Sequence, residues 1–191
     1  MAIIHRAELS PSKPEILQEL LSSRSWGESG ELEVIGAYRF DDPEGEVGIE
    51  CHVVRVGETI YHLPLTYRGT PLEGAEESLV GTMQHSVLGE RHIYDGLGDE
   101  LALDCFRRAL EGEQEQAELQ IVDAEGAVVE IRPQSVILRR EVDVEASEVE
   151  DALDSADEDV TFIVARTLGD LDGAVRLVAS WDGGEGVVAA L

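Results

Sequence analysis

Residues 31–69 read ELEVIGAYRFDDPEGEVGIECHVVRVGETIYHLPLTYRG, and large apolar side chains recur there at every second position. These side chains are Leu32, Val34, Ile49, Cys51, Val53, Tyr61, Leu63, Leu65 and Tyr67. Period two is the spacing along one face of a β-strand, because successive side chains point to opposite sides of a sheet. The breaks DDPEGE and GE suit tight connections between strands. The stretch therefore predicts an antiparallel meander of three strands.

A helix is predicted just before this meander, in SPSKPEILQELLSSRSW (residues 10–26). Ser12 and Glu15 have the spacing of a capping box, and Pro14 stands where the first helical turn tolerates proline. One apolar stripe follows at helical spacing: Ile16, Leu17, Leu20 and Leu21. We expect a short helix that ends near Ser22 and packs against the sheet.

A hairpin and a second helix are predicted after the meander. LVGTMQHSVLGERHIYDG (79–96) alternates on both sides of a turn around residues 88–90. In GDELALDCFRRALEGE (98–113), Asp99 suits an N-cap and Gly112 suits the helix end. The apolar face of that helix is Leu101, Cys105, Phe106, Ala109 and Leu110.

The rest of the chain returns to strand patterns and predicts a second β-rich part. AELQIVD (117–123), AVVEIRP (127–133) and SVILRREVDV (135–144) predict a second meander, and three further strand-like runs follow it, starting at residues 160, 174 and 187. A composition change near Gly112 divides the chain into subdomains at 1–111 and 112–191, expected to pack closely. Residues 141–159 hold ten acidic and no basic residues, which predicts an exposed connection whose order stays open.

The charge of the chain excludes several classes of partner. With 14 basic and 41 acidic residues the formal net charge is −27, which repels nucleic-acid phosphates and anionic membranes. The first residues lack the apolar core of a signal peptide, and no run is long enough to span a membrane. Cys51 and Cys105 are too far apart for a CxxC motif and are expected to be free buried thiols. We expect a cytoplasmic protein without nucleic-acid or membrane partners.

The candidates for chemistry are five histidines: His5, His52, His62, His85 and His92. None has the HExxH or thiolate spacing of a zinc site, so no metal is expected. Ser86, His85 and Asp95 include the residue types of a hydrolytic triad, but neighbours in a strand point to opposite faces, so His85 would face away from Ser86. The loop YDGLGDE (94–100) lacks the lysine of a phosphate loop and the ligand spacing of a calcium loop. Its carboxylates are interpreted as turn and cap residues.

Two stretches resemble a known family: YHLPLTYRGTPLEGAEESLVGTMQHSVLGERHIYDGLGDE (61–100) and LVASWDGGEGVVAAL (177–191). They are similar to the maltokinase N-terminal cap-like proteins, which occur as the cap of actinobacterial maltokinases and as short stand-alone proteins. Where relatives commonly read HSVLGRRWVYDG followed by Asp-Pro, this chain has Glu90, His92 and Glu100. The resemblance implies an α+β fold with a curved antiparallel sheet wrapped around a helix, as in cystatins, here joined to a second β-rich part.

The resemblance also implies a function without catalysis. A maltokinase continues into a kinase core with HGD or HRD and DFE or DFG motifs, and none of these occurs in the sequence. We therefore expect a non-catalytic module, regulatory or partner-binding, in maltose, trehalose or α-glucan metabolism, with no cofactor. The alternative is a protein that binds a carbohydrate or another small molecule on the concave sheet face. The candidate ligand-binding residues for that alternative are His62, His85, His92 and Tyr94.

Overall fold

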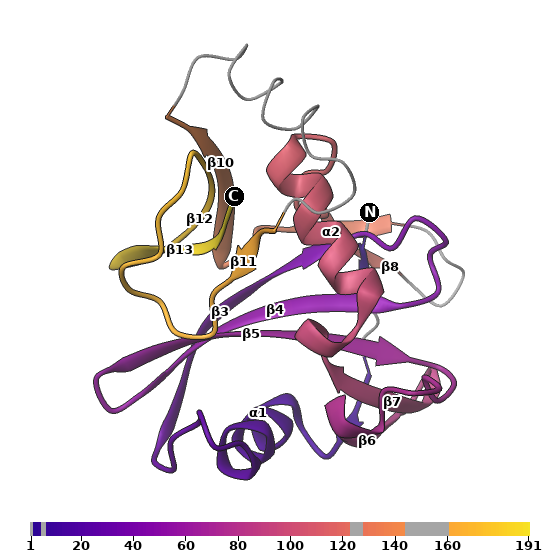
Figure 1. Ribbon diagram of the computed structural model, residues 1–191. Coiled ribbons are helices and arrows are strands. Elements are labelled where there is room, and N and C mark those ends of the chain that lie inside the picture. Colours follow the sequence, from indigo (N-terminus) through magenta and orange to yellow (C-terminus); the bar gives the residue numbers. More distant parts are fainter. Residues whose placement is uncertain (1, 5–6, 123–127, 144–160) are drawn as a thin grey trace.

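The computed structural model describes residues 2–4, 7–122, 128–143 and 161–191 (Figure 1). Its largest sheet has six strands, all paired antiparallel. In spatial order they are β2 (Leu9–Ser10), β6 (Leu79–His85), β7 (Gly89–Asp95), β5 (Thr59–Arg68), β4 (Gly48–Val56) and β3 (Leu32–Phe40). The sheet is curled, and α1 (Lys13–Ser23) and α2 (Glu100–Glu111) lie on its opposite faces (Figure 1). The predicted α+β class with a curved, mainly antiparallel sheet is confirmed.

The first helix begins and packs as its sequence predicts. The backbone N–H and the hydroxyl of Ser12 donate to the Glu15 carboxylate at 2.8 and 2.7 Å, which forms the predicted capping box. The four residues of the apolar stripe are all buried, against one face of the curled sheet. The helix ends at Ser23, one residue beyond the predicted end.

Two smaller sheets complete the fold. β10 (Val136–Val142), β12 (Val175–Trp181), β13 (Gly184–Ala190) and β11 (Ile163–Val164) form a four-stranded antiparallel sheet in that order. β1 (Ala2–Ile4), β8 (Leu119–Val122) and β9 (Val128–Arg132) form a three-stranded sheet in which β1 runs parallel to β8. Two short 3₁₀ helices, η1 (Glu76–Ser78) and η2 (Gly96–Gly98), flank the β6–β7 hairpin.

The predicted second meander is wrong in its connectivity. β8 pairs with β9, but β10 leaves them and pairs with β12 in a different sheet. The cause is packing: β10 starts beside β3, where the Ser135 hydroxyl accepts from the Ala37 N–H at 3.0 Å. A Cβ on Gly36 would lie 2.6 Å from Ser135 Oγ, so the close approach requires glycine there. The predicted acidic connection lies, after Asp143, outside the described residues.

The main core joins residues from both sides of the predicted boundary at 111/112. It lies between the six-stranded sheet, α2 and the four-stranded sheet, and includes Tyr38, Phe40, Cys51, Phe106, Leu177 and Val188. A second core, on the other sheet face, surrounds α1. The α2 helix is capped at its start by Asp99, as predicted, and at its end by Gly112, which has the left-handed φ of 84°. It is therefore the shared packing element between the two parts of the chain.

Candidate functional site

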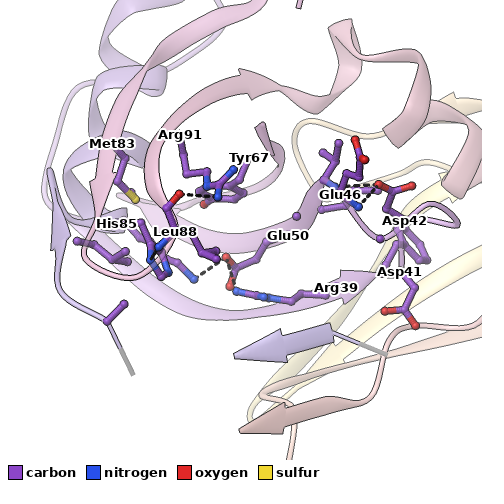
Figure 2. Close-up of a pocket in the computed structure, with 18 residues that line it drawn as sticks. Arg39, Asp41, Asp42, Glu46, Glu50, Tyr67, Met83, His85, Leu88 and Arg91 are labelled. Atoms are coloured by element: carbon purple, nitrogen blue, oxygen red, sulfur yellow. Dashed lines mark hydrogen bonds and ion pairs between the residues drawn. The ribbon is translucent and has the colours of Figure 1, made fainter. Parts of the chain in front are cut away.

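A pocket of about 440 Å³ opens in the curl of the six-stranded sheet, beside the first residue of α1 (Figure 2). Its volume lies in the range of about 300–1,000 Å³ that is usual for small-ligand sites. The β3–β4 turn closes one end, and the β6–β7 turn closes the other. Apolar residues contribute part of the lining, among them Leu9, Met83 and Leu88.

A buried carboxylate, Glu50, lies in the wall of this pocket. Its Oε2 is 2.6 Å from Lys13 Nζ and 3.2 Å from Arg39 Nη2. Arg39 stands directly opposite Glu50 in the β3–β4 register, and Lys13 comes from the start of α1. Burial alone would raise the pKa of the Glu50 carboxyl, but His52, which is protonated in the acid range where Glu50 titrates, together with Arg39 and Lys13 outweighs burial and holds that pKa below its usual value. Glu50 is therefore ionised, and two cations share its single charge.

Two side chains next to Glu50, those of His52 and Tyr67, are uncharged at pH 7. Burial lowers the pKa of His52 to about 4, so its imidazole is uncharged at pH 7. Its Nε2 is 3.2 Å from the hydroxyl of Tyr67, whose pKa burial raises well above the usual value. The permanent positive charge at this place therefore comes from Lys13 and Arg39.

A third cation, Arg91, enters the pocket from β7. Its Nη2 donates to the Leu88 carbonyl at 2.7 Å, which ties it to the β6–β7 turn. Its Nε is buried without a hydrogen-bond partner, and among the described residues no carboxylate forms an ion pair with it. A Cβ on Gly69 would lie 2.6 Å from Arg91 Nη1, so the guanidinium is packed beneath that backbone.

The acidic side chains at the other end of the pocket serve the β3–β4 turn. The Asp42 carboxylate accepts from the backbone N–H groups of Glu44, Glu46 and Val47 at 2.8–2.9 Å. Such bonds hold a turn in one conformation. Figure 2 shows Asp42, Asp41 and Glu46 on the side away from Arg91 and His85. The pocket is therefore polarised, with its cations gathered next to the β6–β7 hairpin.

Of the four predicted ligand-binding residues, His85 lines this pocket and the other three do not. Nδ1 of His85 accepts from the backbone N–H groups of Val87 and Leu88 at 3.2 and 3.0 Å, so the neutral ring carries its proton on Nε2. His92 and Tyr94 stand opposite Arg68 and Thr66 in the β5–β7 register, on the sheet face that packs towards α2. The structure thus does not bring the four residues together.

His62 and Tyr94 are buried and make specific internal contacts. The Tyr94 hydroxyl accepts from the Leu72 N–H at 2.9 Å. His62 is fully buried, and its Nδ1 must donate to the Ala165 carbonyl at 2.9 Å, because a carbonyl only accepts. Its Nε2 then accepts from the Tyr38 hydroxyl, also at 2.9 Å. His62 therefore joins β5 to the segment before β12.

The internal position of His62 predicts a specific pH dependence. Burial lowers its pKa from 6.5 to about 4. Because the unfolded chain takes up the proton first, the stability from neutral His62 is complete above about pH 6.5 and falls as the pH drops towards 4. We expect the native chain to lose about 2 kcal/mol more than His62→Gln between pH 7.5 and 5. Urea unfolding of both proteins across this range measures the difference, and His52 and the carboxylates cancel in the comparison. A gap that stays constant with pH would contradict the assignment.

Sequence reasoning missed Lys13, Arg39, Glu50 and Arg91. One signal was present: Glu50 interrupts the apolar run between Ile49 and Cys51, and a charge inside a buried strand needs a partner. Its partner Arg39 could be found by pairing the strands across the DDPEGE turn. Arg91 gave no such signal, since it stands in a polar hairpin.

In the part of the chain that the structure describes, the potential metal ligands are scattered and not clustered. No group of three or more His, Cys, Asp or Glu side chains there is placed to hold a metal ion. Cys51 and Cys105 are free and buried, as predicted, and burial raises the pKa of the Cys105 thiol to about 11. None of the described helices is both long and apolar enough to cross a bilayer.

Comparison with known proteins gives one family match. Residues 21–99 match the maltokinase N-terminal cap domain. The matched region runs from the end of α1 through the meander and the β6–β7 hairpin to the cap of α2, and so confirms the resemblance there. No curated protein matches the chain, and no solved structure matches it either.

Proposed function

We propose, from the match of residues 21–99 to the maltokinase N-terminal cap domain, that the chain is a non-catalytic cap-like module acting on a partner enzyme. The partner class is an enzyme of maltose, trehalose or α-glucan metabolism. The family match carries the proposal. The lack of kinase motifs in the sequence supports it, because the phosphoryl-transfer residues of a maltokinase have no counterpart here.

The test is capture followed by reconstitution. The immobilised chain is exposed to a lysate of its source, and captured enzymes of this class are purified and assayed with and without the chain. An unrelated protein of matched size and charge is the control, because a net charge of −27 attracts basic proteins without specificity. We expect one such enzyme to be retained by the chain alone and to change its rate. Equal capture by the control, or no change in rate, would contradict the proposal.

A second candidate function is favoured by the pocket itself: binding of a carbohydrate or another small molecule on the concave sheet face. The pocket combines apolar lining with a few charged groups, which is the usual composition of small-ligand sites. A ligand that binds only the native state raises the melting temperature. The panel for this measurement is maltose, trehalose and longer malto-oligosaccharides.

Two neighbouring residues provide a matched pair of variants for this test. Leu88 lines the pocket, whereas Val87 beside it does not, and both are exposed. Leu88→Ala is expected to reduce the melting shift given by a pocket ligand, while Val87→Ala leaves it unchanged. If the shift is unchanged in both variants, or reduced equally in both, Leu88 does not contact the ligand and the assignment to this pocket fails.

A further inference from the structure

We infer that the pocket binds a small organic anion, whose carboxylate or phosphate group lies next to Arg91, Lys13 and Arg39. The inference rests on the second function proposed above and deepens it, because it names the charged group of the ligand. It does not depend on a partner enzyme. Three observations carry it: the charge at this end of the pocket, the bonding of Arg91 and the apolar lining.

The charge balance at this end of the pocket is positive. Lys13, Arg39 and Arg91 line it together, and the nearby carboxylate is Glu50. His52 is neutral, so it does not change the sum at pH 7. Asp41, Asp42 and Glu46 line the opposite end, where the Asp42 carboxylate is bonded to the β3–β4 turn, so the positive charge belongs to one end of the pocket and not to the whole of it. In a partly enclosed site such charges attract an anion more strongly than they would on an open surface.

The bonding of Arg91 leaves it able to bind an anion. Its bond to Leu88 holds the guanidinium in place but does not neutralise it, since a carbonyl has no net charge. Within the described ranges no carboxylate pairs with it, and the partnerless Nε shows that the protein does not use all its donors. Arginine is the side chain best suited to carboxylate and phosphate groups, because its planar donors match two oxygens at once.

Lys13 and Arg39 together contribute net positive charge to this site, because they share a single carboxylate partner. One carboxylate, Glu50, offsets one of their two charges, and the Lys13 side chain keeps 30% of its area exposed. They come from α1 and β3, whereas Arg91 comes from β7, so the site exists only when the sheet curls around α1. An anion held here would contact elements that are far apart in the sequence.

The lining indicates that the ligand has an organic body as well as a charge. Leu9, Met83 and Leu88 line the pocket near the cations, and Tyr67 adds a ring to its wall. The pocket of about 440 Å³ is much larger than an inorganic anion needs. Its size suits a phosphorylated sugar or a sugar acid. Both carry a negatively charged oxygen group, which is a phosphate in the first and a carboxylate in the second.

The test is calorimetric titration of the full chain at low ionic strength with three probes. Glucose 6-phosphate carries a phosphate, gluconate carries a carboxylate, and glucose has neither. We expect at least one anion to bind and glucose to bind at least tenfold more weakly, because hydrogen bonds to a charged group are the stronger ones. Added salt is expected to weaken the binding of the anion, because it screens the charges. The anion that binds more tightly identifies the oxyanion class.

Arginine variants give the matched comparison. Arg91→Gln is expected to weaken anion binding about tenfold or more. Arg55→Gln is the control, because Arg55 pairs with the exposed Glu33 and does not line the pocket; its affinity is expected to be unchanged. Lys13→Gln, at the partly exposed first residue of α1, is a second variant in case Arg91→Gln fails to fold, and a weakening of several-fold is expected. Melting curves without ligand verify that each variant is folded.

The outcomes separate this inference from the function on which it rests. Glucose binding as tightly as both anions overturns the anion site but keeps small-molecule binding. Equal anion affinity of Arg91→Gln and Arg55→Gln also overturns the site. If none of the probes binds, the inference fails, and the second function fails with it only if the uncharged panel of maltose and trehalose gives no melting shift.

Discussion

Replacement of Asp99 by alanine is expected to lower the free energy of unfolding by about 3–5 kcal/mol, because it leaves a paired cation without its partner. Asp99 is 1% exposed. Its carboxylate accepts from Arg68 Nε and Nη2 at 2.8 and 2.7 Å, and from Thr66 Oγ1 at 2.6 Å. It also accepts from the Leu101 N–H at 3.1 Å and so caps α2. One side chain thus joins β5 to the beginning of the helix between the two sheets.

Two further variants separate these contributions. Asp99→Asn keeps an acceptor for Leu101 and Thr66 but loses the charge, so a smaller loss than that of Asp99→Ala is expected. Asp104→Ala, which removes a partly exposed aspartate paired with Arg107 on the same helix, is expected to change stability by less than about 1 kcal/mol. Denaturant unfolding at pH 7 measures all three variants. A loss below about 1 kcal/mol for Asp99→Ala would contradict its joining role.

Phe106→Ala is expected to lower the free energy of unfolding by about 3–5 kcal/mol, the usual loss when a buried phenylalanine becomes alanine. Phe106 is fully buried. Its ring meets Phe40 edge-on at 5.2 Å between centroids and His62 at 5.7 Å, also edge-on. The same core holds Leu177 and Val188 of the four-stranded sheet. Phe106→Ala should therefore destabilise both parts of the chain.

The two tryptophans make this second prediction specific. Trp26 packs beside Tyr61 at the edge of the α1 core, and Trp181 packs against the main core from β12. In single-tryptophan proteins made with Trp181→Phe or Trp26→Phe, fluorescence follows one core at a time, because Trp26 lies at the α1 core and Trp181 at the main core. We expect both probes to report one transition that Phe106→Ala shifts equally. Separate transitions would show that the two cores unfold independently, and Leu103→Ala, on a less buried position of α2, is the control.

The proposed functions place different demands on the same scaffold. A cap-like module acts through its surface, whereas an anion site acts through the pocket beside α1. The experiments are independent, because capture of an enzyme does not involve Arg91 and titration with a sugar phosphate needs no partner. Binding of an anion that also alters capture would join the two functions, with the pocket as the regulatory site.

Local structure was readable from the sequence because its signals act over a few residues. The capping box of Ser12 and Glu15, the cap Asp99 and the glycine at 112 each depend on near neighbours. Alternation likewise indicated β3, β4 and β5, and the turns between them indicated antiparallel pairing. The resemblance carried by residues 61–100 then placed these elements in a curved sheet around a helix.

What only the tertiary structure decided is which distant residues meet. The parallel pairing of β1 with β8 and the antiparallel pairing of β10 with β12 join segments that are far apart in the sequence, which no local pattern records. The same holds for the pocket, since Lys13, Arg39 and Arg91 converge only through strand register and the curl of the sheet around α1. The sequence by itself therefore determined most of the elements and, through the resemblance, the fold class. Long-range packing created the cationic end of the pocket, because charges far apart along the chain become one site only when the sheet closes around them.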